Sequence, residues 1–125
     1  MGRRRSHAMD PLERIRSHIA DFAGFDGAEA RRRSDQQIRS YAGEKLIPLR
    51  DSSIPDDRRQ LLDRLLLRSE FANQRAFHGF DDEASAEQIA RVAAADADLL
   101  DAADAGDLDA LDRAYDARDA AMQGQ

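Results

Sequence analysis

Apolar side chains recur at every third or fourth position along most of this chain, which is the spacing of amphipathic helices. The pattern predicts a first helix that begins at Asp10 and ends before Gly24. Asp10 and Glu13 form a capping box there, and Pro11 occupies the first helical position. A second helix follows Gly27 and should end or kink at Pro48, because proline lacks the backbone donor that a helix interior needs. Residues 50–54 are then predicted to form a loop.

The third predicted helix, over residues 55–78, has apolar side chains on two faces. Most of its leucines fall in one broad arc of the helical wheel, whereas Leu67 and Phe71 project from nearly the opposite side, among charged neighbours. Such a helix is either central in its bundle or covered by a second chain. We therefore predict an interface at Leu67, Phe71, Arg64 and Arg68, with a second copy of this chain as the expected partner in a homodimer. The alternative is that another helix of the same chain covers Leu67 and Phe71.

Two more helices are predicted after residue 84, and the residues between them indicate an antiparallel hairpin. Ser85 begins a capping box, Gly106 stops the fourth helix, and Asp107 caps the fifth. A connection this short with a cap beside it is typical of two antiparallel helices. No segment alternates as a strand would. The sequence therefore predicts an all-α fold, a small bundle of four to five helices with a C-terminal antiparallel helical hairpin.

The turn within residues 102–111 resembles the small-residue helical turn of ankyrin repeats and of some flagellar export chaperones. The resemblance covers this segment alone and occurs once, whereas repeat folds need several copies to bury a core. It therefore implies no function for the chain.

Charge is distributed unevenly along the sequence. Residues 1–80 carry 16 basic and 12 acidic side chains, whereas residues 81–125 carry 3 basic and 13 acidic ones. At this length we expect one helical domain over residues 10–125, after a basic N-terminal extension at residues 1–9. The domain would consist of a three-helix part, residues 10–80, and an acidic hairpin, residues 81–125. Opposite net charges should favour docking of the two parts, although exposed pairs each contribute little.

Several classes of protein lack their residue signatures in this chain. Without cysteine there is no disulfide and no thiolate site, and no apolar run is long enough to span a membrane. The basic start is followed by a charged amphipathic segment in place of the apolar core of a secretory signal, so the cytoplasm is the expected compartment. The acidic segment 101–112 has a glycine at the sixth position of a possible calcium loop. However, Ala103 and Ala105 supply no side-chain oxygen there. We predict no cofactor, no metal site and no catalytic site.

Two alternatives to a protein-interaction module remain. Arg31, Arg32 and Arg33 precede a capped helical segment, and together with Gln36 and Arg39 they could contact nucleic acid, with the acidic hairpin as an internal competitor. A third possibility is an enzyme with a carboxylate and histidine site, since residues 70, 74 and 78 share a helical face that ends in a histidine. The sequence favours, in this order, a self-associating, non-enzymatic helical module, a nucleic-acid-associated regulator, and an enzyme.

Overall fold

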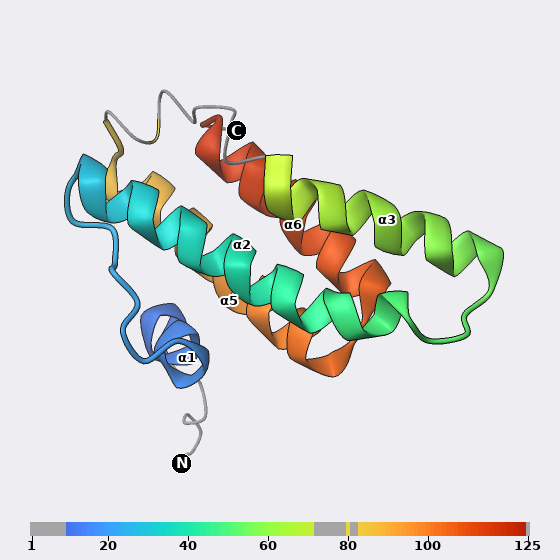
Figure 1. Cartoon of the computed structure of the whole chain (residues 1–125). Coiled ribbons are helices and arrows are strands. Elements are labelled where there is room, and N and C mark those ends of the chain that lie inside the picture. The colour runs from blue at the N-terminus through green and yellow to red at the C-terminus, as the bar shows by residue number, and fades with distance from the viewer. Residues whose placement is uncertain (1–9, 72–79, 81–82, 125) are drawn as a thin grey trace, which may run out of the picture.

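The computed structural model describes residues 10–71, 80 and 83–124; the side chain of Phe71 lies outside this described part. Within these residues the chain forms helices and no strand (Figure 1). The all-α fold predicted from the apolar spacing is therefore confirmed. The helices are α1 (Pro11–His18), α2 (Ala28–Arg50), α3 (Asp56–Phe71), α5 (Ala86–Ala105) and α6 (Leu108–Met122).

The four longer helices form two layers (Figure 1). α2 and α3 lie side by side in one layer, and α5 and α6 form the other, with α2 packed on α5 and α3 on α6. The short helix α1 packs against α5. The apolar faces of all five helices meet between the layers and bury a single core. Its largest fully buried apolar members include Ile15, Ile38, Leu46, Leu62, Leu65, Leu99, Leu100, Leu111 and Tyr115.

The C-terminal hairpin has the turn that its sequence predicts. The Ser85 side chain accepts a hydrogen bond of 3.0 Å from the backbone N–H of Gln88, which caps the start of α5. Gly106 ends α5 in the left-handed region at φ 69°, where an L side chain would be strained. Asp107 then caps α6 by accepting from the N–H of Ala110.

α1 is shorter than the apolar spacing predicts, because the chain leaves the helix at Ile19. Phe22 still enters the core, but from the segment that connects α1 to α2. Side chains of α2 satisfy the backbone of this segment. Ser34 donates to the carbonyl of Gly24, and the Gln37 amide accepts from the N–H of Ala23. The spacing therefore predicted burial correctly and helix length wrongly, since a connecting segment can supply buried residues at the same intervals.

α2 was predicted to end or kink at Pro48; an end there is wrong, because the helix continues to Arg50. A proline removes only one backbone N–H donor from the helix. The carbonyls of Arg50 and Ser52, which follow Pro48, accept hydrogen bonds from a side chain of α3. The Arg59 guanidinium of α3 donates to the carbonyl of Arg50 at 3.0 Å and to that of Ser52 at 2.9 Å. α3 extends through Phe71 in the described part, and the rest of its predicted range, residues 72–78, lies outside it.

Candidate functional site

The outward face of α3 carries the candidate interface. Leu67 is 51% exposed, whereas Leu61, Leu62 and Leu65 of the same helix are buried in the core. The helical wheel predicted this orientation of Leu67. The side chain of Phe71, its predicted companion, lies outside the described residues.

Arg64 and Arg68, the two cations predicted beside Leu67, bind carboxylates of α6. An Arg64 Nη2 atom lies 2.9 Å from Asp112 Oδ2, and Arg68 contacts the carboxylates of Asp112, Asp116 and Asp119 at 2.9 to 3.0 Å. The Arg68 guanidinium also lies 5.1 Å from the centre of the Tyr115 ring. Burial alone would lower the pKa of Arg68, but the hydrogen bonds to Asp116 and Asp119 raise it above its usual value. These contacts direct Arg64 and Arg68, the cations next to Leu67, towards α6.

A second charged cluster joins α1 and α2 to the other edge of the hairpin. His18 Nε2 lies 2.8 Å from Asp101 Oδ1, and His18 Nδ1 lies 3.0 Å from Asp104 Oδ2. Arg14 also binds Asp101, at 2.6 Å, and the Tyr41 hydroxyl donates to Asp104. The two edges of the acidic hairpin are thus each paired with cations of the three-helix part.

The same contacts shift the pKa values of the acidic groups in this second cluster. Burial would raise the pKa of Asp101, but hydrogen bonds from Arg14 and His18 lower it below its usual value. The hydrogen bond from Tyr41 lowers the pKa of Asp104. Burial, followed by the contact with Asp104, raises the pKa of Tyr41 to about 12. The Tyr41 hydroxyl and the carboxylates of Asp101 and Asp104 keep their ordinary charges at neutral pH, so these contacts serve to join the helices. We call the cluster of Arg14, His18, Tyr41, Asp101 and Asp104 the surface clamp.

The residues predicted to contact nucleic acid are divided between the core and the surface. Arg31 and Arg39 are only 7% and 2% exposed. Arg31 donates to the carbonyls of Phe25 and Phe80, and Arg39 donates to the carbonyl of Arg68. These two guanidinium groups therefore serve the fold.

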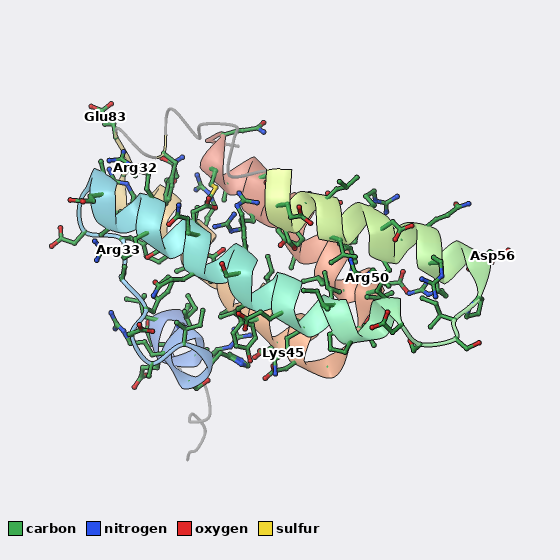
Figure 2. The ribbon with its side chains drawn as sticks, viewed as in Figure 1. Arg32, Arg33, Lys45, Arg50, Asp56 and Glu83 are labelled. Carbon is green, nitrogen blue, oxygen red and sulfur yellow. The ribbon has the colours of Figure 1, made fainter. Side chains whose placement is uncertain are left out.

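The remaining three predicted residues, Arg32, Arg33 and Gln36, are exposed. Figure 2 shows Arg32 and Arg33 near the N-terminal end of α2, with Lys45 and Arg50 farther along the same helix. A nucleic-acid contact at the predicted site would thus depend on the exposed side chains of α2.

Four charged side chains meet in the core between α2, α5 and α6. The sequence interpretation missed three of them and assigned the fourth, Arg39, to a nucleic-acid contact. Asp35, Arg39, Asp96 and Arg118 are all at least 93% buried. Arg118 Nη2 lies 2.7 Å from Asp35 Oδ1, its Nε donates to Asp96, and Arg39 Nη2 lies 2.8 Å from the same Asp35 oxygen. We call these four residues the buried quartet; its two carboxylates and two guanidinium groups balance in charge.

Burial has opposite effects on the acids and bases of the buried quartet. It raises the pKa of Asp96 to about 6, against the opposing effect of Arg118, because a carboxylate loses its hydration in the core. Burial would also lower the pKa of Arg118, but the charges of Asp96 and Asp35 raise it. The guanidinium therefore stays charged, and Asp96 is the group of the quartet whose protonation changes in mildly acidic solution.

The sequence does contain a signal for the buried quartet. Arg118 falls within the apolar stripe of α6, between Tyr115 and Met122, and Asp96 falls between Val92 and Leu99 in the stripe of α5. A charged residue at an apolar stripe position either ends the stripe or enters the core with a partner. In helices this rich in aspartate, that signal is hard to separate from an ordinary solvated face.

The described residues contain an open groove and a smaller pocket. The groove, of about 560 Å³, lies between α5 and α6 and is lined by alanines together with Asp98, Asp101, Asp107 and Arg113. The pocket, of about 200 Å³, lies between the start of α1 and α5 and is largely apolar. No group of three or more histidine and carboxylate side chains in the described part is placed to hold a metal ion. His78 and Gln74, proposed as part of an enzyme site, lie outside the described residues, and Glu70 is exposed on α3.

Comparison with known proteins adds no relative. No family model, curated protein or solved structure matches the chain. None of the described helices combines the length and the apolar character that crossing a membrane requires. A functional proposal must therefore be based on the surfaces and clusters of this chain itself.

Proposed function

We propose that this protein is a non-enzymatic helical interaction module that self-associates through the outward face of α3. The observation that carries the proposal is the half-exposed Leu67 among charged side chains that α6 holds in place. Interfaces typically combine an apolar centre with a polar rim whose geometry is set before binding. The charged clusters support the non-enzymatic part of the proposal, because their carboxylates and cations bind one another within the fold.

Light scattering of the wild type and of Leu67→Asp, alone and with Phe71→Asp, tests the proposal. The wild type should approach twice the 14.0 kDa of one chain as concentration rises. Leu67→Asp should weaken the dimer by about tenfold or more, since a carboxylate would be desolvated at the centre of the interface. Ala117→Asp on the exposed side of α6 is the matched control and should leave the dimer intact. A wild type that stays monomeric at millimolar concentration would falsify the proposal.

A second candidate function is nucleic-acid binding through the exposed side chains of α2. The observation that favours it is that several carboxylates of the hairpin are paired with Arg14, Arg58 and Arg68, while Arg32 and Arg33 stay exposed. Pairing within the fold reduces the repulsion that an acidic hairpin would exert on a phosphate backbone.

Charge reversal is the appropriate test of this candidate, because deleting the hairpin would remove Leu99, Leu111 and other core residues. If the chain retards duplex DNA at low salt, Arg32→Glu with Arg33→Glu should abolish the effect, and Arg113→Glu on α6 should not. Equal retardation by the two variants would refute a site on α2.

A further inference from the structure

The layer formed by α2 and α3 presents a wider surface than α3 alone, and its exposed charges are segregated by helix. The exposed charged side chains of α2 are Glu29, Arg32, Arg33, Glu44, Lys45 and Arg50. Lys45 is paired with Asp104 of α5 at 3.3 Å, which leaves three cations and two carboxylates for the outward face of α2. The exposed charged side chains of α3 are four carboxylates and one cation: Asp56, Asp57, Asp63, Arg64 and Glu70. Figure 2 shows Arg32, Arg33, Lys45 and Arg50 along α2, and Asp56 at the start of α3. A surface of α2 with a small net positive charge thus lies beside an acidic surface of α3 in the same layer.

Each helix of this layer also exposes one large apolar side chain. Ile47 of α2 is 46% exposed and Leu67 of α3 is 51% exposed, the two large apolar side chains with such exposure among the described residues. Ile47 lies half a turn round α2 from the buried Ile38, and Leu67 lies about half a turn round α3 from the buried Leu65. Both therefore point away from the core.

The two apolar side chains are also at similar heights in the layer. α2 and α3 are antiparallel, because Arg39 reaches the carbonyl of Arg68 near one end and Arg59 reaches that of Arg50 near the other. Between these contacts the helices lie close together where Gly43 faces Ser69, since a Cβ at Gly43 would lie 3.8 Å from that of Ser69. Counted from this pair, Ile47 and Leu67 are separated along the helix axes by less than one turn. They can therefore belong to one patch.

The area available to a dimer favours the use of both helices. α3 has 16 residues, so it is about 24 Å long, and a strip one helix wide would bury roughly 240 Å² on each partner. The area buried on both partners together, roughly 480 Å², is well below the ~1,000 Å² expected of a specific interface. The α2–α3 layer offers about twice the width and reaches this value.

Building on the proposed function, we infer that the dimer forms face to face through the α2–α3 layer, with α3 of one copy seated on α2 of its partner. A two-fold axis parallel to the helices exchanges α2 and α3 and places the acidic helix on the basic one twice, as an isologous interface requires. It also brings Ile47 of each copy to Leu67 of the other. An α3-on-α3 dimer would instead oppose two acidic surfaces, which costs affinity.

Cysteine cross-linking tests this arrangement directly, because the chain contains no cysteine of its own. Ile47→Cys is prepared with uniform 15N labelling and Leu67→Cys without it, so that the two chains differ in mass, and each is treated with a short bismaleimide alone and as a mixture. The mixture should give several times more cross-linked dimer than either variant alone, and the product should contain one chain of each. Ala117→Cys on α6, mixed with either variant, is the matched control and should give little product.

The outcomes separate this inference from the proposed function. If Leu67→Cys links mainly to itself while light scattering still shows a dimer, the α3-on-α2 arrangement is overturned and self-association through α3 stands. If every variant and the wild type are monomeric, both proposals fall. If the monomer binds duplex DNA and loses that binding with Arg32→Glu and Arg33→Glu, the α2 surface serves nucleic acid and the inference is overturned.

Discussion

The buried quartet and the surface clamp around His18 each contain two aspartates, but their surroundings differ. In the quartet, Arg118 and Asp96 are fully buried and each has its charged partners inside the core. In the clamp, Asp101 and Asp104 remain 51% and 39% exposed while they bind Arg14 and His18. Charge pairing at the surface replaces good hydration with good contacts, whereas pairing in the core must offset a large loss of hydration.

This difference determines how each region responds to change. A surface pair that loses one partner leaves a group that water can solvate, so the cost is small and falls further with salt. A buried pair that loses one partner leaves an uncompensated charge in the core. The quartet therefore makes the packing of α2, α5 and α6 mutually dependent, and the surface clusters only adjust it.

The largest effect is expected from removing one member of the buried quartet. Arg118→Met should lower the free energy of unfolding by about 3 to 5 kcal/mol, because Asp35 and Asp96 would then share the core with Arg39 alone. The measurement is urea unfolding at neutral pH. Asp96→Leu combined with Arg118→Met restores charge balance and should recover much of the loss. A double variant as unstable as the sum of its two single variants would show that the groups act independently.

Asp96 should give the next largest effect, as a dependence of stability on pH. Its pKa in the fold, about 6, lies above its usual 3.8, so the folded state binds this proton more tightly than the unfolded chain does. The stabilisation is complete below about pH 4 and is lost as pH rises through 6, by up to about 3 kcal/mol. The isosteric Asp96→Asn cannot titrate. The wild type should therefore lose stability relative to this variant between pH 4 and pH 7.

The other acidic clusters act in the opposite direction and must be separated from this effect. The lowered pKa values of Asp101 and Asp104 contribute stability that is present at neutral pH and lost as the solution becomes more acidic. The comparison with Asp96→Asn cancels these contributions, since both proteins retain the clamp. A constant difference between the two proteins across pH 4 to 7 would contradict a raised pKa for Asp96.

The contrast between the two regions also explains what could be predicted from the sequence. The turn at Gly106 and Asp107 was predictable because stop and cap signals act within a few residues of one another. The position of Leu67 opposite the buried leucines of α3 followed from the helical period, which left open whether another helix covers it; the structure leaves it 51% exposed. The pairing of Arg118 with Asp35 joins residues far apart in the chain, and no local rule selects one aspartate of many. Length and composition likewise left open which cations would meet the hairpin; the structure assigns that role to Arg14, Arg58, Arg64 and Arg68 among others.

The smallest effect is expected at the pair between Arg58 of α3 and Asp109 of α6, which tests the other side of the comparison. Their closest charged atoms are 3.2 Å apart, and the Asp109 side chain is 59% exposed. Arg58→Ala should therefore lower the free energy of unfolding by only about 0.5 kcal/mol at low salt, and by less in about 0.5 M salt, where screening is strong. Urea unfolding of both proteins at the two salt concentrations measures this, with Arg113→Ala on α6 as a control for loss of an exposed arginine. A loss of several kcal/mol in the free energy of unfolding that salt does not reduce would mean that exposed ion pairs hold α3 on α6. Charged pairs in the core and at the surface would then not differ in their contribution to stability, contrary to the comparison with the buried quartet.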